Sequence, residues 1–62
     1  MTRHIDTGIA GVSAVVRFLP GGYVILEIYG VASRDDVDAI AARHGYFVDV
    51  DLSDGSFQLG FE

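Results

Sequence analysis

Hydrophobic and β-branched residues first gather in two short runs, residues 12–19 and 23–29, on either side of a Pro-Gly-Gly segment at 20–22. Runs of this length and composition are typical of strands, and Pro followed by Gly is a strong turn signal. A three-residue loop sets Leu19 opposite Tyr23. The pattern therefore predicts an antiparallel hairpin.

The register of this hairpin separates an apolar face from a mixed one. The apolar face is expected to carry Ala14, Val16, Phe18, Val24, Leu26 and Ile28. The mixed face receives Ser13, Val15, Arg17, Leu19, Tyr23, Ile25, Glu27 and Tyr29. Arg17 and Glu27 fall on a diagonal of the mixed face, within reach of each other. A slip of one residue would mix the two sets, so their segregation favours this register.

A helix with both ends marked is predicted next. Ser33 is a suitable N-cap, and Asp36 follows three residues later, near the positive end of the helix dipole. An apolar stripe at helical spacing is formed by Val37, Ile40, Ala41 and His44. Gly45 is placed to end the helix. A helix of about eleven residues is too short to persist alone, so we expect it to pack against a sheet.

The C-terminal residues predict a second hairpin, with strands at 46–52 and 56–61 around Asp54-Gly55. Asp-Gly is a pair that a two-residue type I′ turn prefers. The register that follows pairs Ser53 with Ser56 and turns one apolar set to a single face: Val48, Val50, Leu52, Phe57, Leu59 and Phe61. The reverse face is expected to show Phe47, Asp49, Asp51, Gln58 and Gly60.

This order of elements predicts an α+β fold, ββαββ, in which one helix packs on one face of a four-stranded, mainly antiparallel sheet. Residues 1–62 are expected to form a single small acidic domain, because so short a chain has no room for a second core. Residues 1–11 predict a loosely held lead-in. The pattern does not decide which hairpin strands meet in the centre of the sheet.

One helix covers only one face of a sheet, so the other face is expected to present apolar side chains. These are Val15, Leu19, Tyr23, Ile25, Tyr29 and Phe47. Soluble monomers seldom expose a contiguous apolar patch larger than a few hundred Å². The face therefore predicts a contact surface, for a second copy or for a target. The alternative is that residues 1–11 fold over it.

Charge narrows the choice of partner. Nine acidic residues against four Arg, with no Lys, give a net charge of −5. Residues 1–26 hold two Arg and one Asp, a net of +1, whereas residues 27–62 hold two Arg and eight acids, a net of −6. An acidic surface disfavours direct binding to nucleic acid and attracts basic protein surfaces. The alternative is that the acidity reflects genome composition or salt adaptation.

Other classes of site find little support. The absence of Cys excludes disulfides and thiolate metal sites. Asp49, Asp51 and Asp54 resemble part of a calcium loop, but the third acid comes one residue late and the flanks read as strands. The aromatic residues of the mixed face resemble an RNA-stacking platform, yet the acids beside them disfavour that role.

Catalysis and membrane insertion are not expected either. His4 and His44 have no evident catalytic partner, and a sheet with one helix rarely encloses a substrate pocket. We therefore expect no enzyme activity, no cofactor and no metal. The sequence contains no run of about 18 apolar residues and does not begin like a secretory signal. Cytoplasmic residence is expected.

The arrangement as a whole resembles small acidic inhibitors carried by phages and mobile elements, such as anti-CRISPR proteins. The resemblance covers the hairpin–helix–hairpin order and a set of surface acids, without a shared motif: Glu27, Asp35, Asp36, Asp38, Asp49 and Asp51. It implies a mode of action in which carboxylates occupy Arg and Lys sites that a nuclease complex keeps for nucleic acid.

Two functions are therefore expected as alternatives. The first is a protein-binding module that blocks a basic target, and the second is a self-associating, homodimeric accessory or structural domain with no inhibitory role. The expected partner-binding residues are those six acids together with Tyr23, Ile25, Tyr29 and Phe47.

Overall fold

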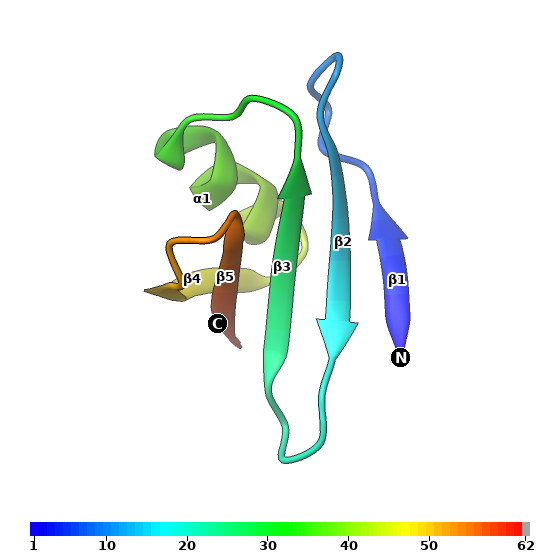
Figure 1. Ribbon diagram of the computed structural model, residues 1–62, viewed down its shortest axis with the longest axis vertical. Coiled ribbons are helices and arrows are strands. Elements are labelled where there is room, and N and C mark those ends of the chain that lie inside the picture. The colour runs from blue at the N-terminus through cyan, green and yellow to red at the C-terminus, as the bar shows by residue number, and fades with distance from the viewer. Residues whose placement is uncertain (62) are drawn as a thin grey trace.

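The computed structural model describes residues 1–61, and Glu62 lies outside the described residues. The chain forms β1 (Thr2–Ile5), β2 (Ser13–Phe18), β3 (Val24–Tyr29), α1 (Arg34–Arg43), β4 (Tyr46–Asp51) and β5 (Ser56–Phe61) (Figure 1). The strands make one antiparallel sheet in the order β1-β2-β3-β5-β4. The α+β class with a single helix is confirmed. The prediction of four strands is wrong, because the sheet formed by residues 1–61 has five.

The additional strand comes from the predicted lead-in. β1 pairs with β2 from Thr2 opposite Arg17 to Ile5 opposite Ala14, and the Phe18 N–H donates to the Met1 carbonyl at 2.8 Å. The expectation of a loosely held segment over residues 1–11 is therefore wrong for β1. β1 lies beside β2 at the edge of the sheet, so it widens the sheet and does not fold over either face (Figure 1).

The first hairpin has the predicted register. Phe18 lies opposite Val24 and Val16 opposite Leu26. The Leu19 N–H donates to the Tyr23 carbonyl at 2.8 Å and closes the loop. The segregation of apolar and mixed residues therefore identified the pairing correctly, because a register shift of one residue exchanges the faces.

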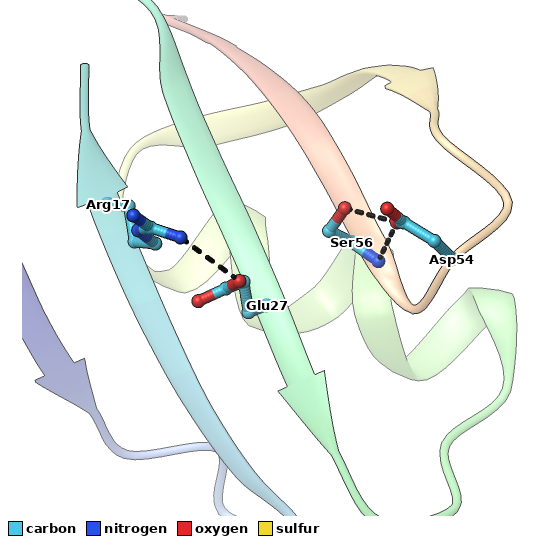
Figure 2. A network of polar contacts seen from close by, with 4 residues as sticks. All are labelled: Arg17, Glu27, Asp54 and Ser56. Carbon is cyan, nitrogen blue, oxygen red and sulfur yellow. Dashed lines mark hydrogen bonds and ion pairs between the residues drawn. The ribbon is translucent and has the colours of Figure 1, made fainter.

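The helix covers the apolar face of the sheet. Ser33 is the N-cap of α1, and Val37, Ile40 and Ala41 of the predicted stripe are buried. The hydrophobic core consists of Ala14, Val16, Val24, Leu26, Val37, Ile40, Ala41 and Leu59. Figure 2 views the sheet from the side that faces away from α1, so the helix lies behind the strands. We call the side of the sheet that faces away from α1 the uncovered face.

The second hairpin differs from its predicted register. Val48 lies opposite Leu59 and Val50 opposite Gln58, with a bulge between them at residue 49. The Leu52 N–H donates to the Ser56 carbonyl at 3.2 Å, so the loop holds residues 53–55 instead of the predicted Asp-Gly pair. A bulge inserts one residue into one strand only, which changes the face of every residue on one side of it.

The bulge reverses the predicted orientation of the second half of β4. Val50 and Leu52, expected to face the helix, lie on the uncovered face and are 43% and 40% exposed. Asp51, expected on the uncovered face, lies opposite Phe57 and turns toward the helix side. Bulges also increase strand twist. Figure 1 shows β4 turned steeply across the direction of β5.

The loop between β1 and β2 is held to the end of α1. The Thr7 hydroxyl is buried, donates to the Val12 carbonyl at 2.8 Å and accepts the Ile9 N–H at 3.1 Å. Arg43 Nη1 donates to the Thr7 carbonyl at 3.0 Å, across 36 positions of sequence. This loop therefore closes one end of the core.

Candidate partner-binding surfaces

The structure divides the predicted partner-binding residues between two surfaces. The uncovered face carries Tyr23, Ile25, Glu27, Tyr29, Phe47 and Asp49. The first turns of α1 carry Asp35, Asp36 and Asp38. Asp51 lies apart from the uncovered face for the reason given above. The predicted residues are thus not one continuous site.

Most of the predicted apolar residues of the uncovered face reach solvent. Tyr23 and Tyr29 are each 54% exposed and Phe47 is 45% exposed, while Ile25 is half-buried. Val15 is an exception at 8%, because it lies between β1 and β3, opposite His4 and Glu27. The prediction that Val15 is uncovered is wrong, since it did not include the strand that flanks β2.

An ion pair interrupts the apolar residues of this face. Arg17 Nη1 lies 3.6 Å from Glu27 Oε2, on the side of the sheet turned to the viewer in Figure 2. Because alternate residues of β3 share a face, Glu27 separates Tyr29 from Ile25. Tyr29 is therefore isolated, whereas Ile25 adjoins the residues around Tyr23.

Phe47 and Gly60 form a contact that sequence reasoning missed. The two residues lie opposite each other on β4 and β5, and a Cβ at Gly60 would collide with the Phe47 ring. An aromatic ring often covers a strand glycine in this way. The available signal was the glycine itself, since a glycine inside a strand indicates close approach by another group.

The acids of α1 differ in how far they are engaged. Asp36 belongs to a capping box: its Oδ2 accepts the Ser33 N–H at 3.2 Å, and its own N–H donates to Ser33 Oγ at 3.1 Å. Asp38 accepts from Arg34 Nε at 3.1 Å. Asp35 is exposed and lies outside the capping box. Asp36 therefore has a structural role that a charge reversal would remove.

The acids of β4 and its following loop are also unequal. Asp49 accepts from Gln58 Nε2 at a long 3.5 Å, whereas Asp51 accepts the Ser53 N–H at 2.8 Å. Ser53 has φ +62°, so this bond supports an unfavourable backbone conformation. Asp49 is consequently the acid of β4 whose carboxylate is freest to meet another molecule.

Asp54 is the acid with a perturbed pKa. Its carboxylate accepts the Ser56 hydroxyl and the Ser56 N–H, the latter at 3.0 Å (Figure 2). These hydrogen bonds favour the charged form and lower the pKa of Asp54 below its ordinary value of 3.8. Sequence reasoning considered Asp54 as a turn residue and as a calcium ligand, but not as an acceptor for Ser56, although Asp two residues before Ser is typical of an Asx turn.

The described residues contain no obvious site for small ligands. Within residues 1–61, no three His, Asp or Glu side chains gather where a metal ion would bind, and no pocket is found. No helix in this part of the chain has the length and apolarity needed to cross a membrane. Comparison with protein-family models, curated proteins and solved structures found no match, so a proposal of function depends on the surfaces described above.

Proposed function

We propose that this chain is a small acidic protein-binding module that docks against a basic surface of a target complex and blocks its nucleic-acid-binding site. This is the mode of action of phage-type inhibitors such as anti-CRISPR proteins. The module acts in the cytoplasm, without catalysis or cofactor, and contacts neither nucleic acid nor membrane itself.

The observation that carries the proposal is the separation of charge across the sheet. Arg3 lies on β1, at one edge of the sheet, whereas Asp49 and Asp51 lie on β4, at the other edge. Fields of one sign concentrated on one side of a small protein steer oppositely charged partners into contact. The β4 side of the molecule is therefore the side that a basic surface would approach.

Two further acidic segments lie near the end of β3. The Ile28 N–H donates to the Gly55 carbonyl at 3.1 Å, which holds the loop containing Asp54 against the last residues of β3. The start of α1 follows β3 after a short connection, and Figure 1 places it toward the same end of the molecule as this loop. Carboxylates grouped in this way suit a partner that presents several Arg or Lys side chains.

The structure also indicates which acids make a clean test. Asp36 and Asp51 accept backbone hydrogen bonds, so changing them would alter the fold as well as the charge. Asp35, Asp38 and Asp49 are exposed and lack such bonds. A combined Asp35→Asn, Asp38→Asn and Asp49→Asn variant raises the net charge from −5 to −2.

The matched control adds the same charge elsewhere. Thr2→Lys, Ala10→Lys and Ser13→Lys together also raise the net charge from −5 to −2, at exposed positions on the β1–β2 side. We expect the Asn variant to bind at least about 10-fold more weakly, since three exposed charge pairs contribute roughly 0.5 kcal/mol or more each. The Lys control should lose clearly less binding affinity than the Asn variant.

Binding and inhibition are measured against a panel of purified RNA-guided nuclease complexes, with cleavage of target DNA as the second readout. Equal losses in the two variants would show that only net charge matters. If the Asn variant inhibits as well as the unmodified chain, these acids do not form the docking surface.

A further inference from the structure

We propose that two copies of this chain pair through an apolar band on the uncovered face. The apolar band consists of Leu19, Tyr23, Ile25, Phe47, Val50 and Leu52. This inference does not depend on the proposed function, because the occupant is a second copy and the acids of α1 take no part in it.

The members of the apolar band are neighbours by strand register. Leu19 pairs with Tyr23 at the end of the first hairpin. Extending the β3–β5 register by one residue beyond Val24 opposite Leu59 places Tyr23 beside Gly60. The ring of Phe47 lies over Gly60 and so bridges β5 to join the band. Val50 continues it along β4, and Leu52 continues it just beyond the end of that strand.

The bulge in β4 makes the band larger than the fold requires. Without the extra residue, strand alternation would turn Val50 and Leu52 toward the helix, where they would enlarge the core. The bulge turns both outward instead, next to the exposed ring of Phe47. A device that moves apolar side chains from the core side to the solvent side suits an interface and does not stabilise a lone chain.

The charge of the face favours a second copy over a basic partner. Within residues 1–61, the carboxylates on this face are Glu27, which is paired with Arg17, and Asp49, which accepts from Gln58 between Ile25 and Val50. The other acids of the described chain lie on α1, in loops or on the helix side of β4. Two such faces meet with little repulsion although each copy has a net charge of −5.

The area of the band matches a weak dimer. Two aromatic rings that are about half exposed contribute about 100 Å² each. The partly exposed aliphatic members add about 40 Å² each, for a total near 350 Å² of apolar surface. Two copies would together bury about 700 Å² of apolar surface. Because interfaces are about 57% apolar, the whole interface would bury about 1,200 Å², which is the low end for stable complexes. We therefore expect a dissociation constant in the micromolar range.

Sedimentation velocity tests the pairing directly. From about 5 µM to about 500 µM the mass should rise from one chain toward two. The 6.7 kDa of one chain makes the two species easy to separate. The melting temperature should rise with concentration over the same range, because mass action stabilises a dimer. A single-chain mass throughout would overturn the proposal.

A pair of tyrosines provides a matched comparison. Tyr23 and Tyr29 are the same residue type and are each 54% exposed, but Tyr29 lies outside the band, beyond Glu27. Tyr23→Glu should abolish the mass increase, whereas Tyr29→Glu should dimerise like the unmodified chain. Equal effects of the two substitutions would show that the band is not the interface.

A second pair decides the question if Tyr23→Glu fails to fold by circular dichroism. Val50→Asp changes an exposed member of the band, and Val31→Asp changes a loop residue that is 95% exposed. Only Val50→Asp should keep the chain monomeric at high concentration. Monomers in both variants, or dimers in both, would contradict the proposal.

Discussion

At the scale of single residues, Gly30 carries a requirement that its place in the sequence does not reveal. It follows β3 with φ +114°, and a Cβ there would lie 2.5 Å from the Gly11 carbonyl oxygen. The end of β3 therefore touches the backbone of the loop that precedes β2. Only a residue without a side chain allows both the conformation and the approach.

We predict that Gly30→Ala destabilises the chain more than Gly22→Ala. Gly22 also has positive φ, at +84°, but open space surrounds its missing Cβ. Gly22→Ala should cost about 1 kcal/mol from conformation alone. Gly30→Ala should cost about 1–2 kcal/mol more, because backbone must move to admit the methyl group. Urea unfolding of both variants measures the difference, and equal losses would rule out the contact with Gly11.

At the scale of elements, the helix shows how local chemistry compensates for short length. α1 has 10 residues and a capping box in which Ser33 and Asp36 satisfy each other's backbone N–H groups. Its other support is the burial of Val37, Ile40 and Ala41 against the sheet. Short helices are marginal alone, so both contributions are needed.

We predict that Ser33→Ala lowers the free energy of unfolding by about 1 kcal/mol, the usual value of an N-cap. Asp35→Asn is the control, since Asp35 occupies the same turn without a place in the capping box. Its effect should stay within about 0.5 kcal/mol. Chemical denaturation followed by circular dichroism provides both values, and a Ser33→Ala variant as stable as the control would show that the cap contributes nothing.

At the scale of the whole molecule, long-range contacts join the N-terminal loop to the end of the helix. Arg43 reaches the Thr7 carbonyl, and His44 Nε2 lies 3.4 Å from the carbonyl of Asp6. These contacts hold the loop between β1 and β2 over the open end of the core, where Ile5 and Ile9 pack. The extra strand is thereby tied to the rest of the fold by more than its own pairing.

We predict that Arg43→Met loosens this loop while Arg34→Met does not. Methionine keeps most of the apolar stem and removes the donor, so the loss should be about 1 kcal/mol, the net value of one hydrogen bond. Arg34 makes an exposed ion pair with Asp38, which contributes little. Hydrogen exchange of the amides at residues 7–12 should accelerate in Arg43→Met alone. Unchanged exchange there would mean that β1 pairing is sufficient to hold the loop.

Particular residues show how far prediction from sequence reached. The helix ends and the first hairpin were predicted correctly because Ser33, Asp36 and the Pro-Gly-Gly loop act on their immediate neighbours. The prediction of which residues are exposed on the uncovered face was also largely correct, since the positions of Tyr23, Tyr29 and Phe47 follow from alternation near well-defined turns. The Val50 and Leu52 positions were not, because a single bulged residue reversed the alternation.

The sequence by itself determined the elements whose signals are local: a hairpin, a capped helix and a second pair of strands, with an acidic C-terminal half. Only the tertiary structure decided that residues 2–5 complete the sheet, that β3 and β5 meet in its centre, and that β4 bulges at residue 49. The physical reason is that turns and caps are stabilised by neighbours in sequence. Strand partners and bulges are instead selected by free edges and packing, which exist only once distant segments have come together.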